Sequence, residues 1–387
     1  MSKLDTIILK VAAPCNLDCA YCYEYNRGDD SWKRKPKSIS SDTLEAVGRR
    51  LAEYGVAESI DVFRVNLHGG EPMLLGAAGL DAAIKTLRET ASPVRLAFGM
   101  QTNATLATAE IIDVLRRHRV AVGVSLDGGP WANRFRVDHQ GRSSYERAVA
   151  GIHRIRDAGL FAGIQAVIEL DSDPCDVLDT LANFNPPRIE LGQPFGSHSN
   201  PPRGSTRYRL SEWLLDCYAY WKATPRLSRI PITVLQDALV AIISDRSHSD
   251  WFPGAPPGYI IVATDGSYEG LDTLKIAGAA GRETAMNVST NNMHEVLAHP
   301  HVSARIDMDR LSDQCKRCAI RPWCNGGYYP TRYSDERGFD NPSYYCTELK
   351  DLFAGLARDV LSSGRIKEEQ RRTILMRLHQ LEVSNGT

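Results

Sequence analysis

Residues 6–22 have the sequence TIILKVAAPCNLDCAYC, an apolar stretch that runs into three closely spaced cysteines. The apolar part, Thr6–Val11, is rich in β-branched residues and predicts a buried strand. Cys15, Cys19 and Cys22 then follow in the loop at the carboxyl end of that strand. Three thiolates are one fewer than a closed structural metal site uses, so a four-iron cluster held by them keeps one iron open for a small ligand.

Similar apolar stretches recur along the first half of the chain, and helical patterns separate them. The predicted strands are Thr6–Val11, Val62–Leu67, Arg95–Met100, Ala121–Leu126, Ala162–Ile168 and Arg188–Leu191. The predicted helices are Asp42–Tyr54, Leu80–Glu89, Ala107–His118 and Tyr145–Ala158. Repeated β/α units of this kind predict an α/β fold with a parallel sheet curled into an open or partial barrel, whose active-site loops lie at the carboxyl ends of the strands.

The β/α rhythm ends near residue 200, where a stretch rich in Pro, Ser and Asn begins. We therefore expect four parts: a barrel over 1–200, a helical bridging region over 201–258, a cysteine-containing domain over 259–350 and a C-terminal helix over 351–387. The bridge contains the predicted helices Ser211–Lys222 and Val234–Asp245. A hairpin, Tyr259–Thr264 with a turn at Asp265-Gly266, opens the third part, and the tail pattern covers Gly364–Leu381.

The composition argues against several classes of protein. The 46 Lys and Arg residues nearly balance the 47 Asp and Glu residues, so neither a nucleic acid nor an anionic membrane is expected as the main ligand. The longest apolar run, Ala238–Ile243, is too short to span a bilayer, and the first residues lack a secretory signal. We expect a cytoplasmic protein whose nine cysteines form no disulfide scaffold: the two groups of cysteines hold metal or do redox chemistry, and the isolated Cys175 and Cys217 are inert thiols.

The cysteine loop resembles that of the radical S-adenosylmethionine (SAM) superfamily. His68-Gly69-Gly70-Glu71-Pro72, at the end of the second predicted strand, is similar to the GGEP motif of that superfamily, which holds the amino group of SAM. The resemblance implies a [4Fe-4S] cluster on Cys15, Cys19 and Cys22, whose open iron binds SAM and cleaves it to a 5′-deoxyadenosyl radical. The alternatives are a zinc knuckle completed by a His or a remote Cys, and an ordinary strand–helix turn.

The same resemblance implies further SAM contacts at the strand ends. They are Tyr21 beside the cluster, Gly69, Gly70 and Glu71 at the amino group, Gln101, Asn103 and Ser125 after the third and fourth strands, Arg136 at the carboxylate, and Ile168 and Phe195 at the adenine. An arginine fork suits a carboxylate, although Asn133 or Arg134 could hold that place instead. For each of these residues the alternative is a core or surface role.

A second group of cysteines, Cys315-x2-Cys318-x5-Cys324 and Cys346, supplies four thiolates near the end of the chain. Spacing alone suits either zinc or a fully ligated iron–sulfur cluster. Attached to a radical SAM barrel, this segment resembles the SPASM extension, which carries up to two auxiliary [4Fe-4S] clusters. The implied architecture is a partial (β/α)6 radical SAM barrel followed by a reduced SPASM domain.

The comparison with a complete SPASM domain also reveals a difference. Leu271 and Tyr328 stand where two cysteines of the full pattern belong. The missing thiols are those that hold the first auxiliary cluster in relatives, so the resemblance implies one auxiliary cluster, the one distal from SAM. Asp272 follows Leu271 directly and corresponds to the substrate base of sulfatase-maturating members. We expect it to be catalytic, with a surface carboxylate as the alternative.

Four longer sequence segments narrow the resemblance to one family of SPASM enzymes. Leu160-Phe161-Ala162-Gly163, the 264–269 string TDGSYE, Cys315-Lys316-Arg317-Cys318 and the 338–346 string GFDNPSYYC look like the FxsB-type SPASM peptide maturases. That family forms cyclophanes: the radical removes a β-hydrogen of a ribosomal precursor peptide, and the carbon radical bonds to an aromatic ring. A flavodoxin- or ferredoxin-type electron donor is implied. The alternatives are a formylglycine-generating sulfatase maturase and a non-catalytic zinc or iron–sulfur protein.

Overall fold

The computed structural model describes residues 4–247, 249–253, 258–278, 283–303 and 310–385. Within them, one nine-stranded sheet has the order β6-β5-β4-β3-β2-β1-β7-β8-β9. The parallel strands are β1 (Thr6–Ala12), β2 (Val62–Gly69), β3 (Arg95–Thr102), β4 (Ala121–Ser125), β5 (Phe161–Val167), β6 (Ile189–Gly192) and β7 (Tyr259–Val262). The antiparallel strands are β8 (Ser267–Glu269) and β9 (Glu283–Asn287).

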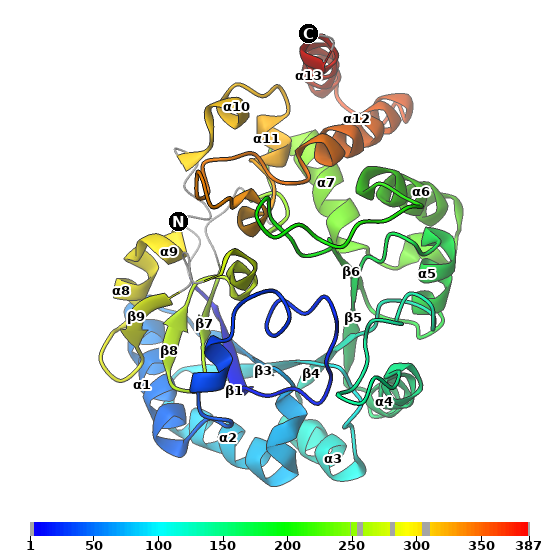
Figure 1. Ribbon diagram of the computed structural model, residues 1–387. Coiled ribbons are helices and arrows are strands. Elements are labelled where there is room, and N and C mark those ends of the chain that lie inside the picture. Colours follow the sequence, from blue (N-terminus) through cyan, green and yellow to red (C-terminus); the bar gives the residue numbers. More distant parts are fainter. Residues whose placement is uncertain (1–3, 248, 254–257, 279–282, 304–309, 386–387) are drawn as a thin grey trace.

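Helices cover the outer side of the curled sheet (Figure 1). Those of the β/α region are α1 (Ser41–Ala57), α2 (Gly76–Thr90), α3 (Ala109–His118), α4 (Tyr145–Asp157) and α5 (Pro174–Ala182). Those that follow are α6 (Leu210–Ala223), α7 (Thr233–Ser244), α8 (Met293–Ala298), α9 (Pro300–Ser303), α10 (Asp313–Lys316), α11 (Arg321–Cys324), α12 (Cys346–Ser362) and α13 (Glu368–Asn385). Short 3-10 helices include η1 (Ser31–Arg34), η2 (Pro72–Leu75), η3 (Leu227–Arg229), η4 (Asp272–Ala277) and η7 (Tyr329–Arg332).

The predicted α/β fold with a curled parallel sheet is confirmed. Each predicted strand of the first half lies within a few residues of an observed one, and β5 begins and ends one residue earlier than expected. Helix α5 has no counterpart among the predicted helices. Its start signals are nevertheless ordinary, because the Asp173 side chain accepts hydrogen bonds from the first turn and Pro174 is the first helical residue.

The C-terminal tail differs from the single helix predicted over Gly364–Leu381. Two helices are present, and Gly364 lies between them with a positive φ of 64°. Helix α12 buries Leu349, Leu352 and Phe353 in the main core. Helix α13 then begins at Glu368 rather than at Gly364, because glycine ends helices readily in the left-handed conformation.

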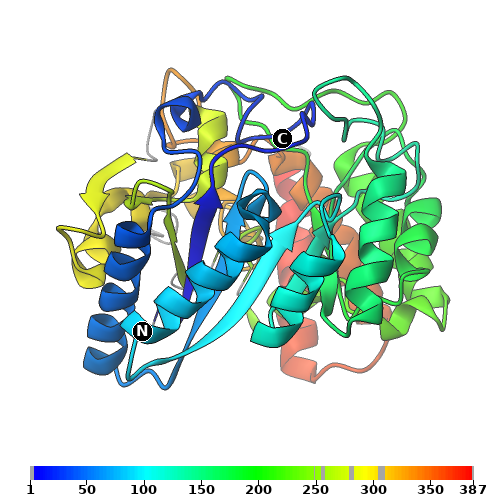
Figure 2. The same ribbon diagram turned by 90° about the horizontal axis from the view of Figure 1, so that it is seen from below.

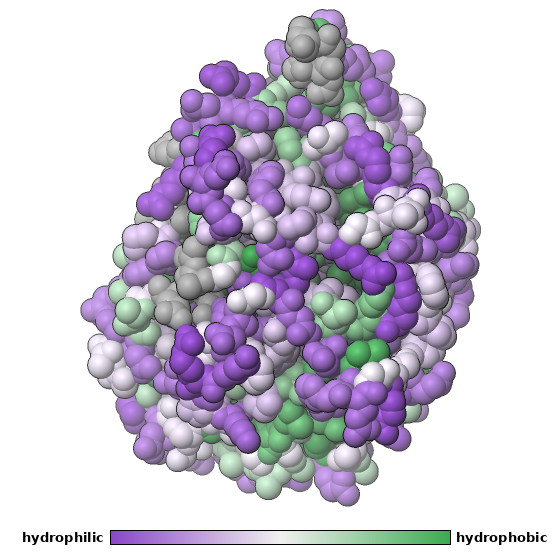
Figure 3. Space-filling view, in the orientation of Figure 1, coloured by the Kyte–Doolittle hydropathy of each residue, from purple (hydrophilic) through white to green (hydrophobic). Residues whose placement is uncertain are grey.

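The strand arrows point toward the side of the molecule where the loop after β1 lies (Figure 2). One buried apolar core extends from Leu4 in the first segment to Leu381 in α13. Hydrophilic side chains cover most of the face in Figure 3, and its largest apolar area lies toward the lower edge. No helix in the described ranges has the length and apolar character needed to cross a bilayer.

Candidate active site and auxiliary cysteine site

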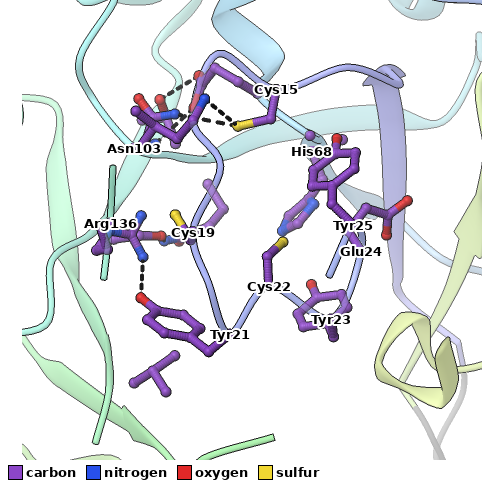
Figure 4. A pocket seen from close by; sticks show the side chains of 18 of the residues that line it. Cys15, Cys19, Tyr21, Cys22, Tyr23, Glu24, Tyr25, His68, Asn103 and Arg136 are labelled. Carbon is purple, nitrogen blue, oxygen red and sulfur yellow. Dashed lines mark hydrogen bonds between the residues drawn. The ribbon is translucent and has the colours of Figure 1, made fainter. Parts of the chain in front are cut away.

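The carboxyl ends of the barrel strands enclose a cavity of about 140 Å³ beneath the loop that follows β1. Cys15, Cys19 and Cys22 all line it, and their sulfur atoms face the same space in Figure 4. The loop is compact, because the Cys22 backbone N–H donates to the Cys19 carbonyl (2.9 Å) and the Leu17 N–H donates to the Cys15 sulfur (3.4 Å). The fold therefore brings the three predicted cluster ligands together.

Burial governs the protonation of these thiols. It raises the pKa of Cys15 and Cys19, and it raises the pKa of Cys22 to about 12. Metal ligands must be thiolates, so cluster assembly in this site would displace protons. Three thiols on one cavity wall are a donor set that fits a [4Fe-4S] cluster with one open iron.

The glycines of the second motif make room for the cysteine loop. Gly69 has a φ of 141°, and a Cβ there would overlap the Ala12 carbonyl oxygen. A Cβ on Gly70 would overlap the Pro14 carbonyl, and the Gly70 N–H donates to Ala12 (2.9 Å). The close approach that glycine permits here is thus made by the loop backbone itself.

Glu71 ties the ends of two strands together. Its buried carboxylate accepts hydrogen bonds from the Thr102 hydroxyl (2.6 Å), the Asn103 N–H (2.8 Å) and the Met73 N–H (3.0 Å). Burial raises the pKa of Glu71, while these donors act in the opposite direction. Asn103 in turn donates from Nδ2 to the Cys15 sulfur (3.8 Å), so Glu71 positions the residue that contacts the first cysteine.

The carboxyl ends of β3, β4 and β5 form another wall of the cavity. Gln101 donates from Nε2 to the Ser125 hydroxyl (2.8 Å), and Ser125 is paired in register with Gln165. Gln165 and Val167 line the cavity, although neither was among the predicted contacts. Ile168, the first residue after β5, does not line this cavity. Side chains two residues apart on a strand face the same side, so Gln165 and Val167 could have been expected to line the cavity together.

A smaller cavity of about 80 Å³ adjoins the first. Ile168 lines this second space, and Phe195 lines both. Of the predicted adenine contacts, Phe195 therefore reaches the main cavity and Ile168 lies beyond its edge.

Arg136 belongs to a buried polar triad at the cavity wall. Its Nη1 donates to the Tyr21 hydroxyl (2.8 Å) and lies 3.8 Å from an Asp127 carboxylate oxygen. Tyr21 donates a short hydrogen bond to Asp127. Burial raises the pKa of Asp127, and the Arg136 charge opposes that rise. Tyr21 and Arg136 line the cavity together.

The two neighbouring candidates point elsewhere. Asn133 is fully buried, and its Oδ1 accepts a hydrogen bond from the Asp127 N–H (3.4 Å). Arg134 forms an ion pair with Glu169 (3.1 Å). Because neither residue lines the cavity, Arg136 is the member of this group available to a ligand there.

Asp272 lies beside the cysteine loop. The Tyr23 hydroxyl donates to an Asp272 carboxylate oxygen (2.8 Å), and Tyr23 itself lines the cavity. Phe195 packs edge-on against the Tyr23 ring at a centroid distance of 5.0 Å. Tyr23 was not predicted as a site residue, and it is the contact that connects Asp272 to the cavity wall.

A buried ion network joins the cysteine loop to the C-terminal part. Lys10 on β1 lies 3.0 Å from both Glu24 and Glu269. Lys275 on η4 forms a short ion pair with Glu24 and is only 1% exposed. Buried Lys and Glu are tolerated when they are paired in this way. The network therefore connects β1, the cysteine loop, β8 and η4.

The four C-terminal cysteines line a separate cavity of about 700 Å³. Cys315 lies on α10, Cys318 follows it, Cys324 ends α11 and Cys346 begins α12. Burial raises the pKa of Cys324, and the other three thiols raise it further by repulsion. This proximity and number of thiols fit a fully ligated iron–sulfur cluster. Among the described residues, no three His, Cys, Asp or Glu side chains are arranged for a single metal ion.

Leu271 and Tyr328, which stand where two cysteines of the full SPASM pattern belong, lie in an apolar cluster. Leu271, Leu274 and Tyr329 form a second buried cluster, and Tyr328 and Phe339 pack against it. The Tyr328 and Thr273 hydroxyls share a short hydrogen bond. Leu271 and Tyr328 offer no thiolate here, so this region does not fit a first auxiliary cluster.

The family model of the radical SAM superfamily matches residues 10–181, from β1 to α5. The chain carries a radical SAM domain. Domains of this superfamily use SAM and a [4Fe-4S] cluster, which agrees with the three thiols and the glycine motif at the strand ends. The residue assignments within the site remain predictions.

Two curated relatives are sulfatase-maturating enzymes. The serine-type anaerobic enzyme of Bacteroides thetaiotaomicron is 28% identical over 166 residues, which cover 43% of this chain and 39% of that relative. The cysteine-type anaerobic enzyme of Clostridium perfringens is 21% identical over 374 residues, which cover 91% of this chain and 96% of that relative.

Solved structures share the fold. Native anSMEcpe with bound AdoMet aligns with a TM-score of 0.77 at 20% identity, covering 93% of this chain and 100% of that one. Streptococcus suis SuiB bound to its precursor peptide SuiA aligns with a TM-score of 0.62 at 17% identity, covering 89% and 76%. The likeness extends through the C-terminal part and confirms the barrel followed by a SPASM-like domain.

Proposed function

We propose that this protein is a radical SAM maturase of a ribosomally made peptide, and that it joins an aromatic ring carbon to the β-carbon of a nearby residue. The observation that carries the proposal is the contact between Tyr23 and Asp272 at 2.8 Å. It holds a carboxylate beside the cavity that the three cysteines line. Removing a ring proton requires a base close to the reacting carbon.

The cofactor site follows from the same geometry. Cys15, Cys19 and Cys22 would hold the [4Fe-4S] cluster, and Arg136 would pair with the SAM carboxylate. When bound, cluster and SAM supply a carbon-centred radical able to remove a hydrogen atom from an unactivated side chain. The protein contributes positioning and a cavity that excludes water.

Asp272 completes the proton balance of the reaction. Formation of the crosslink takes two hydrogens from the peptide: a hydrogen atom leaves the β-carbon, and the ring loses a proton and an electron. Asp272 would accept the proton, because a carboxylate has about four lone-pair sites and the Tyr23 hydroxyl (2.8 Å) and the Thr273 N–H (2.9 Å) each take one of them. The auxiliary cluster would accept the electron from the ring, and an external donor of flavodoxin or ferredoxin type would supply the electron that SAM cleavage consumes.

Formylglycine generation is the second candidate, because two curated relatives carry that activity in their names. That reaction oxidises a Cys or Ser side chain to an aldehyde. Leu271 and Tyr328, which take the place of cysteines of the full SPASM pattern, weigh against it. The longer sequence strings likewise favour the cyclophane-forming family.

Co-expression with a short peptide encoded beside the gene tests the proposal. Tandem mass spectrometry should find a peptide that has lost two hydrogens and resists fragmentation between the linked residues. An aldehyde at a Cys or Ser would instead establish the second candidate and overturn the crosslink. Failure of the anaerobically reconstituted protein to release 5′-deoxyadenosine would overturn both.

Two variants assign the roles within the site. Cys15→Ala should abolish SAM cleavage and remove about half of the bound iron, because one of two four-iron clusters is lost. Asp272→Asn should retain SAM cleavage while the crosslinked product falls about 100-fold, the usual size of a general-base effect. Full product formation by Asp272→Asn would show that another group takes the proton.

A further inference from the structure

Arg332 is a buried cation next to the C-terminal cysteines. Its side chain lies in the interior with 3% exposure. Nε donates to the Gly326 carbonyl (3.0 Å), and Nη2 donates to the carbonyls of Asn325 (2.7 Å) and Gly327 (2.9 Å). Within the ranges that the structure describes, no ion pair joins Arg332 to an Asp or Glu.

A buried charge without a counter-charge is costly. Carbonyl oxygens satisfy the N–H groups of a guanidinium but do not neutralise it. Burial lowers the pKa of Arg332, whereas the neighbouring Cys315 and Cys324 thiols raise it. Gly326, whose carbonyl accepts from Arg332, lines the cavity of the four thiols, and the Tyr329 ring beside the guanidinium (5.6 Å) carries no net charge. The anionic form of the cysteine site is therefore the counter-charge that lies at hand.

The charges of the cavity wall have the same sign. Arg317, Arg321 and Lys350 line the cavity with the four thiols, and the lining includes neither Asp nor Glu. Arg317 and Arg321 are exposed to solvent, where water screens their charge. Arg332 differs from them because it lies in the interior, where a charge acts more strongly.

The turn after the third cysteine of this group is built around Arg332. Asn325, Gly326 and Gly327 all have positive φ values, of 49°, 79° and 69°. A Cβ on Gly326 would approach the guanidinium Nη2 to 2.8 Å. The three carbonyls of this left-handed run all accept from one side chain, directly after Cys324. Arg332 and the Cys324 turn thus form one unit.

We propose that Arg332 is the buried counter-charge of the auxiliary cluster and raises its reduction potential. A four-iron cluster with four thiolates carries net negative charge, and reduction adds one more electron. A fixed cation nearby stabilises the reduced form more than the oxidised form, and local charge is one of the factors that set cluster potentials. Arg332 acts through the cluster and is a positioning residue.

A redox titration of the auxiliary cluster alone tests this proposal. The full chain with Cys15→Ala, Cys19→Ala and Cys22→Ala would retain that cluster, and electron paramagnetic resonance would follow its reduction. Arg332→Gln should lower the ratio of reduced to oxidised cluster about tenfold at a fixed potential, a midpoint shift of about 59 mV for one electron. Arg332→Lys should stay close to the parent, and Arg321→Gln should change it little because that cation is exposed.

Each outcome separates charge from turn geometry. An unchanged potential in Arg332→Gln with full iron content would overturn the proposal. Loss of iron in Arg332→Gln but not in Arg332→Lys would support it, because the charge is then needed to hold the cluster. Equal loss of iron in both variants would overturn it in favour of a role in the turn alone. The inference depends on the auxiliary cluster and not on the peptide product, so mass spectrometry of the product reports on the proposed function separately.

Discussion

Asp138 shows how a single carboxylate shapes the segment opposite the cysteine loop. It accepts hydrogen bonds from the backbone N–H groups of Gln140 and Arg142 (both 3.0 Å) and from the Arg142 Nε (2.9 Å). Just before it, the Val137 carbonyl accepts from the Asp18 N–H (2.7 Å) of the cysteine loop. The turn at Asp138 therefore supports the backbone pairing that holds this loop.

The stability that Asp138 provides should depend on pH. Burial acts to raise its pKa, but the hydrogen bonds from Arg142 and Gln140 outweigh that effect and hold the pKa at about 2, below the ordinary 3.8. Asp138 therefore stabilises the fold above about pH 4, and the contribution disappears as the pH falls toward 2. Asp138→Asn should be less stable than the parent at pH 7, and the difference should close over that window in chemical unfolding of the apo protein.

Asp157 supplies the matched control for this prediction. It is exposed on α4 and pairs with Arg156 at the surface (3.1 Å), so Asp157→Asn should change stability by less than about 1 kcal/mol at any pH. A gap between Asp138→Asn and the parent that stays constant from pH 7 to about pH 2 would contradict the assignment of the titration to Asp138.

The residues that sequence could locate are those fixed by a motif. The cysteine loop and the glycine motif follow strand ends, and parallel strands end at the same edge of a sheet, so Cys15 and Glu71 were expected to converge. Val167, which the sequence analysis did not single out, lines the main cavity, whereas Ile168 lines the adjoining one, because the exact end of β5 decides which side chain faces which space. The ion network around Lys275 could not be foreseen, since its members lie far apart in sequence.

At the scale of elements, that ion network fastens the cysteine loop to η4. Lys275→Met would leave the Glu24 carboxylate buried beside one cation instead of two. Removing one partner of a buried pair costs about 3–5 kcal/mol. We expect that loss in the free energy of unfolding of the apo protein, measured by denaturant titration, together with weaker iron retention at the three-cysteine site.

A second variant distinguishes charge from packing. Lys275→Met combined with Glu24→Leu removes both partners, and it should recover part of the loss through a favourable coupling energy. Lys222→Met breaks only an exposed pair with Asp359 (2.7 Å) and should cost less than about 1 kcal/mol. Strictly additive effects of the two buried substitutions would show that the pair does not act as a unit.

Elements with a clear local pattern were predicted, and those set by distant contacts were not. The strands of the first half were visible as short apolar runs with turn residues at their ends. The sequence predicts one helix in the C-terminal tail, because the charged pattern after Gly364 is regular while α12 begins inside the cysteine segment. The apolar residues of α12 pack in the main core, and this packing stabilises the helix.

At the scale of the whole molecule, one sheet contains both the barrel strands β1–β6 and the later strands β7–β9. Strand β7 pairs in parallel with β1, with Thr6 opposite Tyr259. Such a pairing joins segments that lie far apart along the chain, and sequence patterns carry no signal for it. The three-cysteine loop follows β1 and Asp272 follows the β7–β8 hairpin, so this shared sheet is what brings the proposed base to the proposed radical site.

A continuous sheet and core predict that the apo protein unfolds as one unit. Trp323 tests this at a point far from the barrel strands. Its side chain is fully buried, its Nε1 donates to Asp245 (3.0 Å), and its ring packs against Phe353 at a centroid distance of 6.0 Å. Trp323→Ala should cost about 3–5 kcal/mol, and hydrogen exchange should show that β1 and α12 lose protection together.

Trp131→Ala, at a side chain that is 62% exposed, should change stability by no more than about 0.5 kcal/mol. Loss of protection in α12 alone, or two calorimetric transitions in the parent, would mean that the barrel and the C-terminal part fold separately.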